Sequence, residues 1–144
     1  MFSKACEYGI KAAVFIAFSS NQRSRVSLNE IAKEIDSPIA FTAKILQQLT
    51  RNKIVSSVRG PSGGFEIDKT KAGKIKLSNI VNAIDGNSIY KGCGLGLQNC
   101  NENSPCPIHH KFALIRNDLK NMLETTSLLD LAIDINKGTT FLKR

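Results

Sequence analysis

The sequence predicts a mainly α-helical chain that carries one small β-hairpin. Apolar residues recur at intervals of three and four in several separate stretches, which is the period of a helix that buries one face. One stretch near the middle alternates instead and leads into the turn sequence Arg59-Gly60-Pro61-Ser62-Gly63-Gly64. With 144 residues and 42% hydrophobic content, the chain can bury one ordinary core. We therefore expect a single globular unit with an appended helix.

Three helices are expected before the hairpin. The first spans Cys6 to Phe18, where apolar residues nearly surround the axis, and should end at the polar run 19–22. The second begins at the capping-box sequence Ser27-Leu28-Asn29-Glu30. The third follows the turn Asp36-Ser37-Pro38, with the serine as N-cap and the proline at the first helical position, and should run to about residue 52. Two short helices joined by a tight turn are typical of a helix-turn-helix.

The third helix should present a polar outer face. Ile45, Leu46 and Leu49 can face the core, because they share one side of a helix. Side chains of types that read base edges and phosphates are then left outside: Phe41, Thr42, Lys44, Gln47, Gln48 and Arg51. An ordinary surface helix also has a polar outer face, so this pattern alone does not indicate DNA binding.

A hairpin directly after the third helix predicts a winged helix-turn-helix. Ile54–Val58 and Phe65–Ile67 should form its strands around the turn 59–64. In that fold the third helix enters the major groove, and an arginine at the wing tip reaches phosphates or a narrow minor groove. The wing glycines would allow close approach to the DNA backbone, although a tight turn needs them as well. The candidate DNA contacts are Ser27, Pro38, Phe41, Thr42, Lys44, Gln47, Gln48, Arg51, Ser57, Arg59, Gly60, Ser62 and Gly63.

The C-terminal half should contain a short helix, a loop and a longer helix. The short helix begins at Ser78 and stops at Asp85-Gly86. The longer one spans about Ile108 to Glu124 and carries the apolar stripe Phe112, Ile115, Leu119, Met122 and Leu123. Such a stripe can pack on its own chain, but beside a DNA-binding head it favours a homodimer on a two-fold site. Thr126-Ser127 should cap a last helix that reaches about Ile135 and is ended by Gly138.

The chain is expected to divide into three parts, and most of its net positive charge lies in the first. Residues 1–86 form the winged helix-turn-helix, residues 87–107 a cysteine-rich loop, and residues 108–144 the dimerization helix with the last short helix. The net charge is +8; residues 1–76 carry 13 Lys and Arg against 6 Asp and Glu, and residues 77–144 carry 7 against 6. This concentration favours an anionic partner for the first part, such as double-stranded promoter DNA.

Three cysteines and a histidine follow the spacing Cys93-x6-Cys100-x5-Cys106-x2-His109. Thiolates and an imidazole on a loop rich in glycine and proline suit an iron–sulfur cluster or zinc. Closely spaced cysteines form disulfides in secreted chains. Here we find no signal-peptide pattern and no run of about 18 apolar residues, so we expect a cytoplasmic protein without a membrane partner. In that reducing compartment, clustered cysteines more often bind metal or do redox chemistry.

Two further residues of ligand type have simpler interpretations. Cys6 lies on a mostly buried helix and is expected to be a small core residue, and His110 is expected to face solvent. A redox enzyme or electron carrier is disfavoured, because the sequence has no nucleotide-binding glycine motif, no CxxC pair and no recognisable catalytic constellation. We therefore expect neither enzyme activity nor a small-molecule substrate.

On these residues the chain resembles the Rrf-type family of bacterial winged helix-turn-helix transcriptional regulators, and its iron–sulfur branch in particular. The resemblance runs from Glu7-Tyr8-Gly9 to Thr126–Leu131 and is most specific in the wing, 55–64, and in the cysteine loop. It implies a homodimer on palindromic promoter sites with one cluster per subunit near the dimer interface. It also implies that Cys93, Cys100 and Cys106 are ligands and that Arg59 contacts DNA.

The resemblance leaves the fourth ligand open between two branches. In the IscR-like pattern, a histidine three residues after the third cysteine completes the site, which favours His109. In the NsrR-like pattern, a carboxylate on the partner's first helix does so, and Glu7 is the nearest match. The six residues between Cys93 and Cys100 depart from the family spacing of about five. Ala43 stands where the IscR-like recognition helix has an acidic residue, which leaves operator specificity open.

The expected cofactor is a 2Fe-2S cluster, with 4Fe-4S as the alternative, and protein prepared in air is expected to lose it. Loss of the cluster should relax the 93–109 loop, shift the dimerization helix and change the separation of the two recognition helices. The signal would be iron–sulfur status, oxidative stress or nitric oxide. A structural zinc ion and metal-free thiol sensing on the same DNA-binding fold remain the alternatives.

Overall fold

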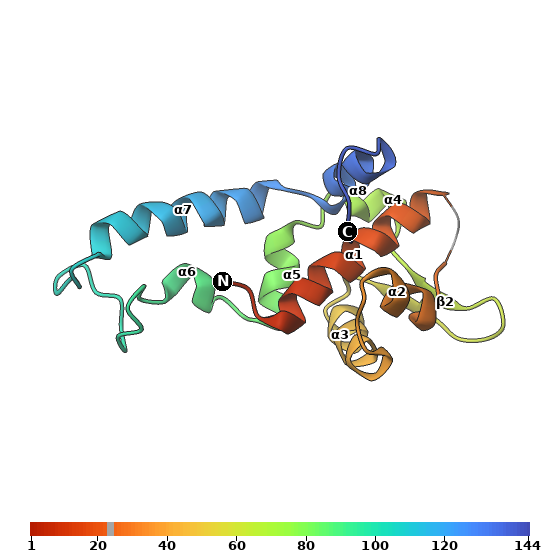
Figure 1. Cartoon of the computed structure of the whole chain (residues 1–144), viewed down its shortest axis with the longest axis horizontal. Helices are drawn as coiled ribbons and strands as arrows, with labels where there is room; N and C mark the ends of the chain where they lie inside the picture. The colour runs from red at the N-terminus through yellow and green to blue at the C-terminus, as the bar shows by residue number, and fades with distance from the viewer. Residues whose placement is uncertain (23–24) are drawn as a thin grey trace.

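The computed structural model describes residues 1–22 and 25–144 and has the expected fold class, mainly helical with one antiparallel hairpin. In Figure 1 most of the elements gather into a head, while α6 and α7 extend to one side with the cysteine loop between them. The elements in chain order are α1 (Lys4–Gln22), α2 (Leu28–Glu34), α3 (Ile39–Arg51), β1 (Ser56–Val58), β2 (Gly64–Glu66), α4 (Lys69–Ala72), α5 (Leu77–Ile84), α6 (Ser88–Lys91), α7 (His109–Thr125) and α8 (Leu128–Asn136).

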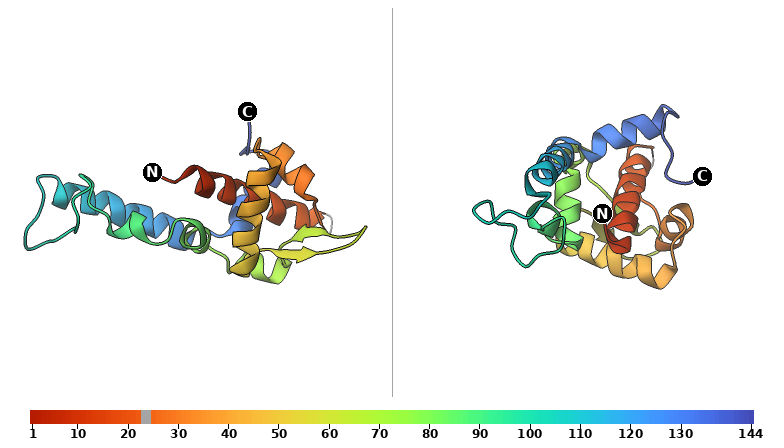
Figure 2. Two further views of the ribbon diagram at one scale, coloured as in Figure 1. Left: turned by 90° about the horizontal axis from the view of Figure 1, so that it is seen from below. Right: turned by 60° about the vertical axis from the view of Figure 1, so that its left-hand side comes forward.

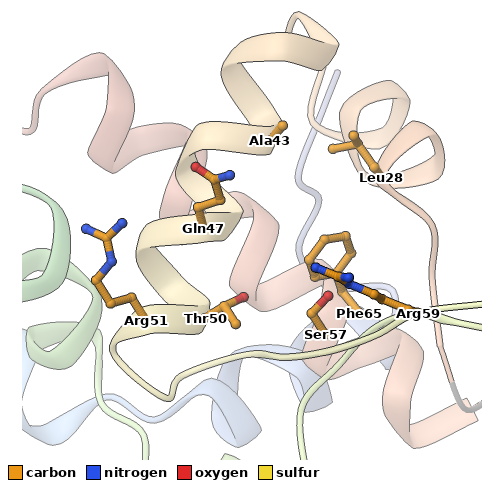
Figure 3. Close-up of a pocket in the computed structure, with 8 residues that line it drawn as sticks. All are labelled: Leu28, Ala43, Gln47, Thr50, Arg51, Ser57, Arg59 and Phe65. Carbon is orange, nitrogen blue, oxygen red and sulfur yellow. The ribbon is translucent and has the colours of Figure 1, made fainter.

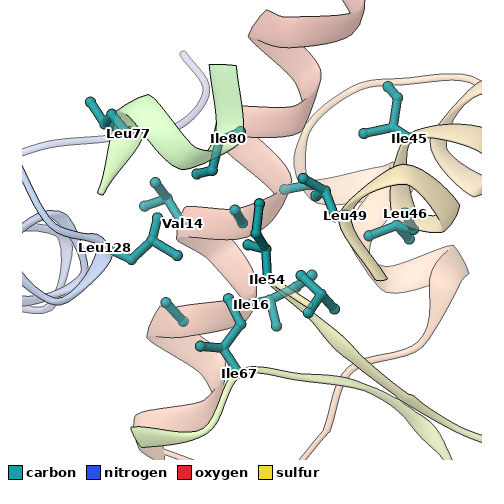
Figure 4. Packing of buried hydrophobic residues seen from close by; sticks show 14 of the residues in the cluster. Val14, Ile16, Ile45, Leu46, Leu49, Ile54, Ile67, Leu77, Ile80 and Leu128 are labelled. Atoms are coloured by element: carbon teal, nitrogen blue, oxygen red, sulfur yellow. The ribbon is translucent and has the colours of Figure 1, made fainter. Parts of the chain in front are cut away.

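The core of the head is built around α1. This helix packs against α2, α3, α5 and α8, and also against α4 and β2. Figure 4 shows the apolar side chains that meet there, and Ile16, Ile45, Leu49, Ile80 and Leu128 are almost completely buried. Because α8 returns to pack on α1, the end of the chain contributes to the same core as the helix-turn-helix. None of the described helices is both long and apolar enough to cross a membrane.

The wing is a short hairpin attached to the segment before α2. Ser57 pairs with Phe65 at its centre, and Val58 pairs with Gly64. Val26 adds a bridge to the outer side of β2: its N–H donates to the Phe65 carbonyl at 3.0 Å and its carbonyl accepts from the Phe65 N–H at 2.8 Å. The wing therefore has backbone support on both sides of β2.

The first helix continues further than the sequence predicts. The polar run 19–22 was expected to end it, yet α1 includes all four residues, and Ser19 and Ser20 are buried. The reason is a long-range hydrogen bond, since the Ser20 hydroxyl accepts from the Ile67 backbone N–H at 3.1 Å. A small polar side chain is thus accommodated in the interior because it satisfies a buried donor just after β2.

Ser20→Ala should lower the free energy of unfolding by roughly 1–3 kcal/mol, because the Ile67 N–H would lose its acceptor in a buried position. Urea denaturation followed by circular dichroism measures the change. Ser88→Ala, at an exposed position on α6, is the matched control and should stay within about 0.5 kcal/mol. Equal effects of the two substitutions would contradict the structural role of Ser20.

The starts of α2 and α3 are close to the expected ones. Ser27 caps α2 as predicted, since its hydroxyl accepts from the Glu30 N–H at 3.1 Å. The helix α3 begins one residue later than predicted, with Pro38 as the N-cap and Ile39 as the first helical residue. The Pro38 carbonyl accepts from both the N–H and the hydroxyl of Thr42, each at 2.9 Å, so the first helical hydrogen bond begins there and Ser37 is not the cap.

Two short helices fall in regions expected to be irregular. The segment between the wing and α5, for which no helix was predicted, contains α4, whose N-cap Asp68 accepts from the Thr70 N–H at 2.9 Å. The helix α6 lies inside the predicted loop 87–107. Four residues are too few to show a helical period in sequence. The helices α5, α7 and α8 agree with expectation within a residue or two. Ser127 and Asp130 form a capping box at α8, and Gly138, with φ of 71°, follows its end.

Candidate DNA-binding face and metal centre

A groove of about 570 Å³ lies between α3 and the wing (Figure 3). Four of the expected DNA contacts line it, two from the helix and two from the hairpin: Gln47, Arg51, Ser57 and Arg59. The remaining lining residues are Leu28, Ala43, Thr50 and Phe65, which were not among those candidates. Thr50 follows Gln47 by three positions, so helical spacing alone could have identified it.

The expectation that Thr42 lies on the outer face of α3 is wrong. Thr42 is completely buried and donates its hydroxyl hydrogen bond to the Pro38 carbonyl. It shares a helix face with Ile45, Leu46 and Leu49, at spacings of three, four and seven, and that face packs on the core. Phe41 is half-buried and meets Tyr8 edge to face at 5.7 Å between ring centroids. Thr42 is therefore not exposed as expected, whereas Phe41 keeps part of its surface accessible.

The other candidates on the helix-turn-helix lie at or near the surface. Ser27, Pro38, Lys44, Gln47 and Arg51 are exposed, and Gln48 is half-buried. Lys44 and Arg51 put positive charge on the exposed side of α3. A basic helix face next to a groove matches the electrostatics of phosphate contact.

The wing tip has a conformation that only glycine tolerates well. Gly60 has φ of 107°, and the Gly63 N–H donates to the Gly60 carbonyl at 2.9 Å. A Cβ on Gly63 would lie 2.2 Å from the Val58 carbonyl oxygen. The two glycines therefore shape the turn that presents Arg59 and Ser62, both of which are exposed.

The cysteine loop brings its four candidate ligands together as two pairs. The sulfur atoms of Cys93 and Cys106 are 3.8 Å apart, and the Cys100 sulfur lies 3.3 Å from the His109 Nδ1. All three are free cysteines, half-buried in the loop, while His109 is buried at the start of α7. Within residues 1–22 and 25–144, no three His, Cys, Asp or Glu side chains form one group placed to hold a metal ion. The Cys93–Cys106 pair and the Cys100–His109 pair would have to move closer together to form a site with four ligands.

The chemistry of this donor set fits an iron–sulfur cluster or a zinc ion. The backbone N–H of Leu95, 3.4 Å from the Cys93 sulfur, is the main cause that lowers the pKa of that thiol. A lowered pKa favours the thiolate, which is the form that binds metal. Three thiols and one imidazole are a ligand set that both centres use.

The other ligand-type residues of the sequence are placed elsewhere. Glu7 forms an ion pair with Lys4 at 2.7 Å, and this contact lowers the pKa of the carboxyl group. Cys6 is completely buried in the core, as expected, and burial raises its pKa to about 12. His110 is exposed, as expected. In the described part of a single chain, only His109 is paired with a loop cysteine as a non-thiol donor.

The long helix α7 carries apolar side chains that its own chain leaves uncovered. Leu123 is buried against the head, and Phe112 and Leu119 are half-buried. Ile115 and Met122, at spacings of four and three from Leu119, are 58% and 45% exposed. The predicted stripe is therefore buried at Leu123, half-buried at Phe112 and Leu119, and exposed at Ile115 and Met122.

Relatives of this chain are named as transcriptional regulators. A family model described as "Rrf2: Iron-dependent Transcriptional regulator" matches residues 2–134. An HTH-type transcriptional regulator of Aquifex aeolicus (strain VF5) is 31% identical over 133 residues, which cover 91% of this chain and 90% of that protein. The HTH-type transcriptional regulator IscR of Xenorhabdus nematophila is 27% identical over 124 residues, which cover 86% of this chain and 74% of that protein.

Solved structures with the same fold are regulators as well. CymR of B. subtilis, described as the global cysteine regulator, has a TM-score of 0.74 at 21% identity, covering 92% of this chain and 96% of the other. IscR of T. potens has a TM-score of 0.73 at 18% identity, covering 97% and 91%. These likenesses confirm the winged-helix fold, and the family match and named relatives confirm a regulator rather than an enzyme. The chain belongs to the Rrf2 family of transcriptional regulators.

Proposed function

We propose that this regulator is a homodimer that binds palindromic promoter DNA with an affinity controlled by an iron–sulfur cluster. Cys93, Cys100, Cys106 and His109 would hold the cluster, with 2Fe-2S favoured over 4Fe-4S. The observation that carries the proposal is the pairing of these four side chains at the start of α7. This pairing supports the proposal because it involves all three cysteines of the loop and His109, the first residue of the helix that connects the loop to the DNA-binding head.

The groove between α3 and the wing is the proposed DNA contact. Gln47 can read base edges in the major groove, because its amide both donates and accepts. Arg51 and Arg59 border the same groove and can neutralise phosphates on either side of it. Lys44 and Ser62 extend this face along the helix and over the wing tip, as expected from the sequence.

The loop residues would hold the cofactor in a reactive setting. When bound, an iron–sulfur cluster supplies a centre that oxidants or nitric oxide attack and that iron shortage depletes. The Leu95 N–H stabilises the thiolate of Cys93, and the buried His109 fixes the end of the loop to the first turn of α7. Cys93 and Cys100 are only half-buried, so small reactants can reach them.

A series of helix–helix contacts connects the cysteine loop to α3, the proposed recognition helix. The helix α7, which begins at His109, packs against α5, and α5 packs against both α3 and α1. A change in the position of the first turn of α7 can therefore shift α3 through contacts between rigid elements. In a homodimer, the same change would alter the spacing of the two α3 helices on a two-fold operator.

The proposal predicts that the protein with its cluster and the protein without it differ in operator affinity by about 5- to 150-fold, the usual range of allosteric coupling. The operator can be selected from a pool of random duplexes with anaerobically purified protein. Electrophoretic shift titrations then compare the two forms at one salt concentration. Equal affinities would contradict control by the cluster and leave only a DNA-binding regulator. A colourless protein with stoichiometric zinc would instead assign the four ligands to a structural site.

A second candidate is a metal-free thiol sensor, favoured by the 3.8 Å distance between the Cys93 and Cys106 sulfurs. Oxidation of these two thiols by a peroxide would form one S–S bond, with both thiol hydrogens and two electrons passing to the peroxide, which becomes water and an alcohol. A movement of about 2 Å would bring the sulfurs to bonding distance. Free-thiol counts before and after peroxide treatment of iron-free protein, together with shift titrations, separate this candidate from the cluster.

A further inference from the structure

The two faces of the wing have different neighbours. Side chains alternate along each strand, so Ser57 and Phe65 point to the groove beside α3. Their strand neighbours Ser56 and Glu66 point the other way and border a separate hollow of about 530 Å³. Glu66 is thus an acidic residue on the back of the wing, away from the groove.

Arg25 lies on this back face and contacts the wing at two residues, one on β2 and one in the tip. Its Nε is 3.4 Å from a carboxylate oxygen of Glu66, and its Nη1 donates to the Ser62 carbonyl at 3.3 Å. Both side chains of the ion pair are about two-thirds buried, with 30% and 31% exposure. We refer to these two contacts as the Arg25 clamp.

The clamp connects the base of the wing, which is well fixed by backbone hydrogen bonds, with the tip, which has fewer of them. At the base, the N–H and the carbonyl of Val26 both form hydrogen bonds with the backbone of Phe65, so β2 is already fixed there. Among the described residues, the backbone of the tip, 59–63, has the turn hydrogen bond from Gly63 to Gly60, and both of these residues are glycine. Arg25 therefore ties the carbonyl of the tip residue Ser62 to Glu66 on β2.

We propose that Arg25 is a positioning residue for DNA binding, which holds the wing tip at the angle that brings Arg59 to the DNA. The inference rests on the proposed DNA contact of the wing and adds a residue outside the groove. Arg25 does not border the groove, whereas Arg59 does. Its positive charge is matched by Glu66 rather than left for a phosphate.

The direction in which one substitution changes the DNA affinity distinguishes a positioning role of Arg25 from a direct contact with DNA. Glu66→Met removes a negative charge near the wing, so electrostatics alone would tighten binding to DNA. If Glu66 instead holds Arg25 in the clamp, the same substitution should weaken binding by about fivefold, the upper value for a partly exposed ion pair. Arg25→Met should weaken binding by a similar factor, and the double variant should be no weaker than either single one, because both remove the same clamp.

The experiment is a set of shift titrations on a duplex selected from a random pool, at several salt concentrations. Arg25→Met, Glu66→Met and the double variant are made in the wild-type and in the Arg59→Ala chain. Glu34→Met, at the end of α2, is the matched control for loss of one negative charge. Urea midpoints show that each variant is folded under the binding conditions.

Positioning predicts that both clamp substitutions lower the salt slope by about one, as Arg59→Ala does, and have no further effect in the Arg59→Ala chain. Tighter or unchanged binding of Glu66→Met beside weaker binding of Arg25→Met would overturn it and make Arg25 a direct phosphate contact. Effects that persist in the Arg59→Ala chain would also overturn it. If Arg59→Ala itself binds normally, the proposed wing contact fails, and this inference fails with it.

Discussion

Cys106→Ser should abolish cluster binding and leave the helical head folded. Cys106 supplies one sulfur of the 3.8 Å pair with Cys93, and a serine hydroxyl is a much poorer ligand for iron than a thiolate. The residue lies on the loop outside the core, so the substitution should change stability by no more than about 0.5 kcal/mol. Anaerobic absorption, electron paramagnetic resonance and iron analysis of fresh protein measure the loss, which should be nearly complete.

The matched control is Cys6→Ala, which removes a cysteine from the buried core instead. It should retain iron, although it should lower the free energy of unfolding by about 1 kcal/mol. Iron that is lost equally from both variants would contradict the loop as the site of the cluster.

Two further substitutions identify the fourth ligand. His109→Ala should reduce the iron content or change the spectrum, because the imidazole lies 3.3 Å from the Cys100 sulfur. Glu7→Gln should leave both unchanged, since this carboxylate is paired with Lys4 within its own chain. The reverse result would assign the fourth ligand to Glu7 across the dimer.

Local sequence signals were sufficient for most of the fold. The capping residues at 27 and 127 and the glycine-rich wing each act within a few residues of the chain, so their structures follow from short-range chemistry. The end of α1 did not follow, because the Ser20 hydroxyl is satisfied by Ile67, a residue 47 positions away. The role of Thr42 was mistaken for a different reason: its side chain is of a polar type, but its hydroxyl donates to the Pro38 carbonyl one helical turn earlier, which allows it to be buried.

The candidate site was predictable in composition but not in arrangement. The residue types and spacing of the loop predicted the candidate ligands, whereas the pairing of Cys93 with Cys106 and of Cys100 with His109 depends on how an irregular loop folds. The Arg25 clamp had no sequence signal. It depends on contacts with Ser62 and Glu66, and such long-range contacts of a surface arginine leave no periodic pattern.

Ile115→Asp should convert the proposed dimer into a folded monomer. Ile115 is 58% exposed on the apolar stripe of α7, so a charge there costs a single chain little. In a two-fold interface, the residue occurs twice and each apolar side chain contributes about 1.5–3 kcal/mol when buried. Loss of both should weaken self-association by about 100-fold or more. Sedimentation velocity across a range of concentrations measures this change.

Binding to a palindromic operator should fall together with the dimer, because a monomer contacts one half-site without the gain in effective concentration from a linked second head. Phe141→Asp is the matched control: it introduces the same charge at a side chain that is 76% exposed but lies beyond α8, outside the stripe. It should leave association and operator binding unchanged. A dimer that survives Ile115→Asp but not Phe141→Asp would move the interface from α7 to the C-terminal segment, and the half-site spacing would then be set by a different pair of surfaces.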